Sequence, residues 1–121
     1  MVLTKDEAEK KAKEIFSLND KIRFIAFTSE NKLIFHSMRK GVKSYSPNKV
    51  DVDIGELMAP IATGIFEKVA EYFGNAEYLL VKFKKVNLFI IPFPKGLLTI
   101  TTEPDYPIEN LAKVKEALNK S

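Results

Sequence analysis

Hydrophobic positions recur along this chain with two different periods, one typical of helices and one typical of strands. The first apolar residues recur at helical spacing among lysines and glutamates, at Ala8, Ala12, Ile15 and Phe16. Thr4 and Glu7, just before them, have the spacing of a capping box. We therefore predict a first helix that ends at Asn19 and Asp20. Because its apolar stripe is narrow, we expect this helix on the rim of the fold.

Runs of branched and aromatic residues predict five strands. The first two are KIRFIAFT and KLIFH, and the three polar residues between them predict an antiparallel hairpin. Three more follow close together near the C-terminus: YLLVKFK, LFIIPF and LLTITT. The first strand is apolar on both faces, which is typical of a central strand or one covered by helices on both sides.

Residues 54–73 predict a long helix with an unusually wide apolar surface. At about 100° per residue, its apolar side chains fill an arc of about 180°, whereas a helix lying on one sheet needs little more than about 100°. Asp53 and Glu56 have the spacing of an N-cap pair, and Gly74 is a conventional helix end. Pro60 would kink the helix or shift its start forward. We expect the excess apolar surface to be covered either by the terminal helices or by a second protein.

The order of these elements predicts a single domain over residues 1–121, of the α+β type. We expect one five-stranded antiparallel sheet, because two strand meanders joined by one crossover have this as their simplest arrangement. The long helix would cover one face, and the first helix together with a last helix over residues 108–118 would cover the other. Residues 37–53 are expected to form the longest loop.

The amino-acid composition excludes several classes of function. The chain has no cysteine and one histidine, His36, so thiolate and polyhistidine metal sites are excluded. Neither a membrane-spanning run nor a signal peptide is apparent, and we expect a cytoplasmic protein. Asp51 and Asp53 could ligate a hard cation, but carboxylates near a helix N-terminus are explained as well by the helix dipole. No catalytic motif is present, and we expect no enzyme activity, cofactor or metal.

Basic residues form two clusters that could bind phosphate groups. Four of them fall in the long loop, at Arg39, Lys40, Lys43 and Lys49, and three near the end of the third strand, at Lys82, Lys84 and Lys85. Only two of the 19 Lys and Arg residues are arginine, which argues against sequence-specific nucleic-acid recognition. A solvated surface explains most of the lysines, while the loop cluster stays open as an anion-binding site.

The element order resembles the roadblock/dynein-light-chain family, with its profilin-like arrangement, over essentially the whole chain. The resemblance is closest in three stretches, ELMAPIATGIFEKVAEYFG, EYLLVKFKKVNLFIIPF and GLLTITT. It implies a homodimer or heterodimer in which the long helices and third strands of two copies pair. It also implies a non-enzymatic scaffold or regulator of a small GTPase or motor-type assembly.

Carried over position by position, this resemblance implies a dimer interface made of the helix residues Ile61, Ala62, Ile65, Phe66 and Val69 and the strand residues Tyr78, Leu80 and Lys82. The sequence leaves open which half of the apolar arc faces the sheet. The alternative function is a profilin-like module that senses a ligand or binds an anion such as phosphate, nucleic acid or a membrane surface.

Overall fold

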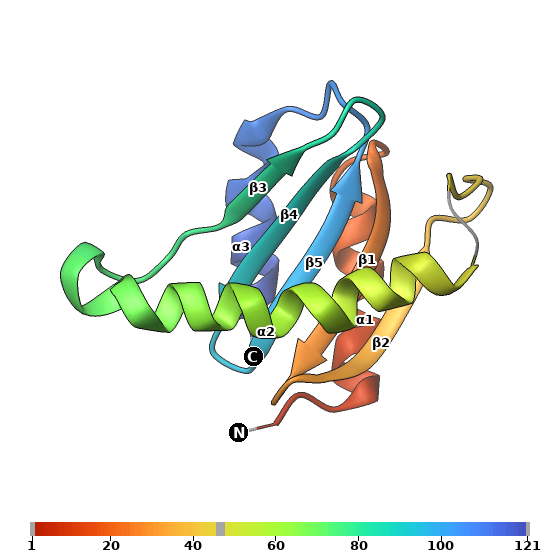
Figure 1. Cartoon of the computed structure of the whole chain (residues 1–121). Helices are drawn as coiled ribbons and strands as arrows, with labels where there is room; N and C mark the ends of the chain where they lie inside the picture. Colours follow the sequence, from red (N-terminus) through yellow and green to blue (C-terminus); the bar gives the residue numbers. More distant parts are fainter. Residues whose placement is uncertain (1, 46–47, 121) are drawn as a thin grey trace.

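One five-stranded antiparallel sheet forms the centre of the molecule (Figure 1). The computed structural model describes residues 2–45 and 48–120, and only the backbone of residues 48–52, 54 and 55. The strand order is β2-β1-β5-β4-β3, so β2 and β3 are the edge strands. The strands are β1 (Ile22–Ser29), β2 (Lys32–Met38), β3 (Leu79–Lys82), β4 (Asn87–Phe93) and β5 (Gly96–Thr102). The predicted strand order along the chain and the antiparallel sheet are confirmed.

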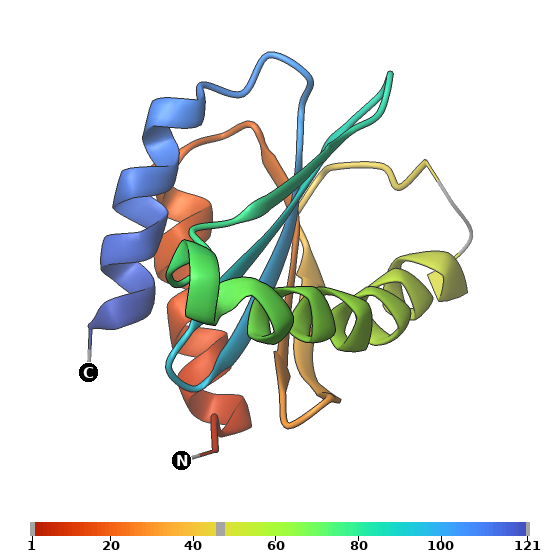
Figure 2. The same cartoon turned by 60° about the vertical axis from the view of Figure 1, so that its left-hand side comes forward.

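Helices lie on both faces of this sheet, as expected (Figure 2). One face carries α1 (Lys5–Leu18) and α3 (Leu111–Asn119), which follows the short 3-10 helix η1 (Ile108–Asn110). The other face carries α2 (Asn48–Phe73) alone. The predicted capping box of the first helix is present, because the Thr4 hydroxyl accepts from the Glu7 amide and the Glu7 carboxylate accepts from the Thr4 amide.

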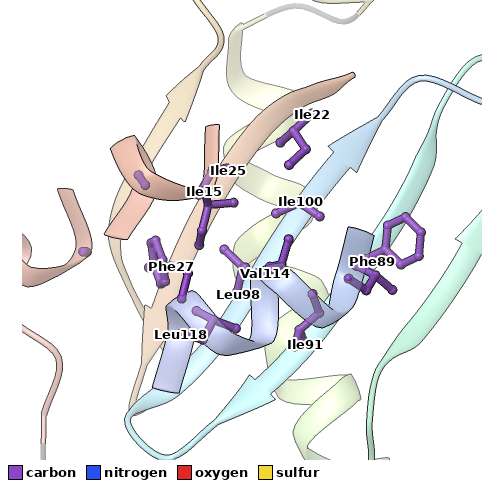
Figure 3. Packing of buried hydrophobic residues seen from close by; sticks show 14 of the residues in the cluster. Ile15, Ile22, Ile25, Phe27, Phe89, Ile91, Leu98, Ile100, Val114 and Leu118 are labelled. Atoms are coloured by element: carbon purple, nitrogen blue, oxygen red, sulfur yellow. The ribbon is translucent and has the colours of Figure 1, made fainter. Parts of the chain in front are cut away.

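The main core lies between the sheet and the pair α1 and α3 (Figure 3). Phe27, Ile100 and Leu98 of the central strands are fully buried there, with Ile15 of α1 and Val114 of α3 packed over them. The opposite face has a much smaller cluster, in which two alanines of α2 pack on apolar side chains of β4 and β5: Ala59, Ala62, Leu88, Ile90 and Leu97. The molecule therefore buries most of its apolar surface between the sheet and the pair α1 and α3. Only a small apolar cluster holds α2 on the other face of the sheet.

The start of α2 corrects one prediction. The helix begins at Asn48, six positions before residue 54, so the predicted loop is shorter and Asp53 lies inside the helix instead of capping it. The acidic residues ahead of residue 54 favour the N-terminal turns of a helix through its dipole, which explains the earlier start. Pro60 lies inside α2 on an exposed position, where water can hydrate the carbonyl that loses its amide partner.

A buried hydroxyl beneath α2 gives a first test of the packing. Thr99 is 1% exposed, pairs with Ala26 and Ile90, and its Oγ1 has no hydrogen-bond partner among the described residues. A buried hydroxyl without a partner retains its desolvation penalty. We expect Thr99→Val to raise the free energy of unfolding by about 1 kcal/mol, measured by urea denaturation. A loss of stability would mean that the hydroxyl has a partner.

Glu7 gives a second test, through the pH dependence of stability. Hydrogen bonds from Lys95 first, and then from the Thr4 amide and hydroxyl, lower the pKa of this carboxyl from 4.5 to about 2. Because the pKa is lower in the folded state, Glu7 stabilises the fold above pH 4.5, and this contribution is lost as the pH falls toward 2.

We therefore expect Glu7→Gln to flatten the decline in stability between pH 4.5 and 2. Denaturation midpoints across that range measure it. The exposed Glu9 on the same helix supplies the control, Glu9→Gln, which should leave the slope closer to that of the unmodified protein. Equal slopes for the two variants would contradict the assignment.

Candidate interaction surface

A row of large apolar side chains lies exposed along one side of α2, next to the side that packs on the sheet. Its members recur at intervals of four and seven residues, so they share one side of the helix. Their exposed fractions are 68% for Leu57, 57% for Ile61, 50% for Ile65 and 77% for Tyr72. We call these four residues the outer face of α2. Large apolar side chains are seldom grouped on the surface of a protein unless another molecule covers them.

The side of α2 that packs on the sheet explains why this row stays outside. Ala59 and Ala62 are buried against the sheet, and the larger Met58 and Phe66 pack around them. Small residues let the helix approach the strands closely, so the contact with the sheet is narrow. A narrow contact covers only part of an apolar arc of about 180°, and the other part becomes the outer face.

The last turn of α2 extends beyond the edge of the sheet (Figure 1). Phe73 is 82% exposed there, although its position on the helix would otherwise face the strands. The helix ends at Phe73 and is followed by Gly74, which has a φ of 83° and donates its amide to the Ala70 carbonyl at 2.8 Å. Glycine accommodates this left-handed conformation without strain. The chain then turns back toward β3, so the overhang and the β3 edge are neighbours in sequence.

The edge strand β3 offers a second element of this surface. It pairs with β4 alone, and its other edge has no strand beside it in the part of the chain that the structure describes. Tyr78, just before the strand, is 40% exposed, and its ring lies edge-on to Phe89 at 6.0 Å. Lys82, at the strand end, donates to Asn87 Oδ1 at 3.0 Å and to the Pro104 carbonyl at 3.3 Å. Free edges of this kind can accept another strand.

The structure separates the expected interface residues into two groups. Ile61 and Ile65 lie on the outer face, Val69 is half-buried, and Tyr78 and Lys82 lie at the β3 edge. Ala62, in contrast, is fully buried against the sheet, Phe66 packs on the same cluster, and Leu80 packs on the main core. Since the side chains of these three contact the protein's own sheet, their place in an interface stays a prediction.

Two residues of the surface were missing from the expected set. Leu57 and Tyr72 are among the most exposed apolar residues of α2. The helical period already carried this signal, because both positions follow the spacing of Ile61 and Ile65. The wheel identified the arc but could not show which of its halves the sheet would cover.

Arg39 of the basic loop is held by contacts within the fold. The Arg39 guanidinium donates from Nη2 to the Phe16 and Asn19 carbonyls and from Nε to the Ile22 carbonyl, each at 2.6 Å. It also lies 5.1 Å from the centre of the Phe16 ring. Arg39 therefore satisfies the carbonyls at the C-terminal end of α1 and is committed to the fold.

The other members of that loop cluster are exposed or lie outside the described side chains. Lys40 and Lys43 are exposed, and Lys49 lies in the first turn of α2, where only the backbone is described. The side chain of Asp51 is likewise outside the described set, so the pair it forms with Asp53 stays untested. His36 is exposed on β2, with its ring 6.2 Å from that of Phe24.

No catalytic arrangement is apparent among the described residues. They contain no group of three or more His, Asp or Glu side chains that could hold a metal ion. An open cavity of about 410 Å³ lies between the C-terminal half of α2 and the β4–β5 turn, lined by Phe66, Ala70, Pro92 and Phe93 among others, with Glu67 its one titratable group. Within the described ranges, no helix has the length and hydrophobicity that crossing a bilayer requires.

The chain is thus an α+β protein that exposes an apolar row on α2 and a free edge at β3. No family model matches the sequence, and no curated protein matches it. Several solved structures share its fold. An MglB structure described as having a tetrameric arrangement aligns with a TM-score of 0.72 and 11% identity, covering 98% of this chain and 90% of that one.

Two further structures agree with this result. The gliding protein MglB from Thermus thermophilus gives a TM-score of 0.71 at 12% identity, covering 98% of this chain and 90% of that one. A roadblock/LC7 domain from Streptomyces avermitilis gives a TM-score of 0.51 at 13% identity, covering 84% of this chain and 82% of that one. The protein therefore has the roadblock/LC7 fold, as its element order suggested.

Proposed function

We propose that this protein forms a homodimer through the outer face of α2 and the β3 edge, and that the dimer acts through protein contacts as a scaffold or regulator of a small GTPase. The observation that carries the proposal is the exposed row of Leu57, Ile61, Ile65 and Tyr72, together with the unpaired edge of β3. Burying a side chain of this size stabilises an association by about 1.5–3 kcal/mol before the costs of association are subtracted.

A single twofold axis pairs both elements of the proposed interface, β3 with the β3 of a second copy and α2 with its α2. A twofold axis perpendicular to the sheet, placed beside β3, pairs two copies of that strand antiparallel and makes one continuous sheet. The same axis brings the two α2 helices side by side on one face of the sheet, because α2 lies on a single face in each copy. Both the free edge and the apolar row are then covered in one step.

Hydrogen–deuterium exchange tests the strand pairing. Half of the β3 amides point away from β4, and in a dimer they would donate to the second copy. We expect exchange in residues 79–82 to slow as the protein concentration rises through the dimer dissociation constant. The opposite edge strand β2 (Lys32–Met38) is the internal control and should exchange at one rate throughout. Concentration-independent exchange at β3 would contradict the pairing.

The proposed GTPase role rests on the fold and on the resemblance of the sequence to roadblock domains. A paired α2 surface would present a broad platform to a partner, and the proposed role requires no catalytic group of this chain. Titration of the purified dimer against small GTPases of the same organism, each loaded with GDP or with a GTP analogue, tests it. Preferential binding of one nucleotide state supports regulation, and no binding to any of them contradicts it.

A further inference from the structure

The turn between β3 and β4 projects from the molecule (Figure 2). Its sequence combines one aromatic residue, Phe83, with two lysines. Phe83 is 54% exposed, although its amide donates to the Val86 carbonyl at 2.9 Å and so fixes the turn. Lys84 and Lys85 are both exposed beside it. About half of the Phe83 side chain is therefore accessible to solvent beside the two lysines.

A second segment adds to the same tip. The ring of Tyr45 contacts two cations, with the Arg23 guanidinium carbon 4.4 Å and the Lys85 ammonium 5.2 Å from its centre. Arg23 also donates to the Lys43 carbonyl at 2.8 Å, which ties this segment to the sheet. Tyr45 is nevertheless 59% exposed, and Lys43 is exposed. We call the group Lys43, Tyr45, Phe83, Lys84 and Lys85 the basic tip.

Nearby carboxylates are already paired with other cations. Glu103 accepts from the buried Arg23 at 2.6 Å, and Asp105 forms an ion pair with Lys21. Among the described residues, none of the three lysines of the basic tip forms an ion pair. In the part of the chain that the structure describes, the tip thus combines three lysines that form no ion pair with two exposed aromatic rings.

We propose that the basic tip docks the protein on an anionic lipid bilayer. Lysines draw a protein to anionic headgroups through diffuse charge attraction, and aromatic rings insert at the boundary between headgroups and acyl chains. A projecting tip fits a deformable planar surface, whereas a bound peptide needs a groove, and the cavity described above lies elsewhere, beside the β4–β5 turn. The tip lies apart from the outer face of α2 (Figure 2), and its Phe83 directly follows Lys82 at the end of β3.

Vesicle co-sedimentation with the full chain tests this proposal. The probes are vesicles of phosphatidylcholine alone and vesicles in which roughly one-third is phosphatidylserine. We expect binding to the anionic vesicles alone, weakening at least about tenfold between about 50 mM and about 300 mM salt. The double variant Lys84→Glu with Lys85→Glu should lose about 30-fold or more in affinity. Phe83→Ala should lose about tenfold.

A matched control separates the tip from net charge. Lys13 and Lys113 are exposed lysines on α1 and α3, and changing both to glutamate alters the net charge by the same amount. This control should keep most of the vesicle affinity. The proposal is overturned by equal losses in the two double variants, by equal binding to neutral vesicles, or by binding to heparin without binding to vesicles. Circular dichroism confirms that each variant is folded.

Discussion

Replacing Ile61 and Ile65 together by glutamate is expected to convert the dimer into a folded monomer. Both side chains are at least half exposed on the outer face of α2, so their removal takes little from the fold of one copy. In the dimer the change places four carboxylates in one apolar contact, where burying unpaired charge is strongly unfavourable. We expect the dimer dissociation constant to rise at least about 1,000-fold, or about 4 kcal/mol, measured by light scattering.

Two single variants make this result specific. Ile108→Glu changes a 44% exposed isoleucine on η1, on the other side of the sheet, and should leave the dimer intact. Phe66→Glu changes a residue that packs on the sheet beneath α2, and should lower the free energy of unfolding by about 2–4 kcal/mol. A dimer that survives the Ile61 and Ile65 changes would rule out the outer face as the interface.

Replacing Arg39 by methionine is expected to destabilise the fold by about 3 kcal/mol, because hydrogen bonds from a charged donor contribute about 1.5–3 kcal/mol each. The change leaves three carbonyls near the end of α1 without this donor while keeping an aliphatic chain over Phe16. Urea denaturation measures it. Lys40→Met, at the exposed neighbouring position, is the control and should change stability by less than about 0.5 kcal/mol.

The same pair of variants separates a structural from an anion-binding role of this loop. If Arg39 held an anion, its loss would weaken heparin retention while leaving the midpoint of denaturation nearly unchanged. The described contacts predict the reverse outcome, a large loss of stability with little change in retention beyond that of Lys40→Met. An unaltered midpoint would contradict the assignment.

The sheet and its helices could be predicted because their signals are local. Alternation along the strands and the capping box of Thr4 and Glu7 depend on residues close in sequence. The start of α2 was missed because Asp53 has the chemistry of an N-cap, and that signal is equally compatible with a position inside the first turns. The choice between these two positions of Asp53 depends on the residues before it, and those residues show no helical period of apolar side chains.

Only part of the candidate surface could be predicted from the sequence, and the reason is physical. The helical wheel gives the angle of each side chain, and it correctly showed more apolar surface than one sheet covers. It does not give the rotation of α2 on the sheet, which the close approach of Ala59 and Ala62 determines. The structural role of Arg39 could not be predicted from the local sequence either, because its carbonyl partners lie about 20 positions away in sequence.

Sedimentation equilibrium of the unmodified protein tests the central claim most directly. The exposed row on α2 and the free edge of β3 should hold two copies together at about 10 µM. For the proposed dimer, we expect a single species of twice the 13.7 kDa chain mass. A single species at 13.7 kDa, persisting up to about 500 µM, would contradict it.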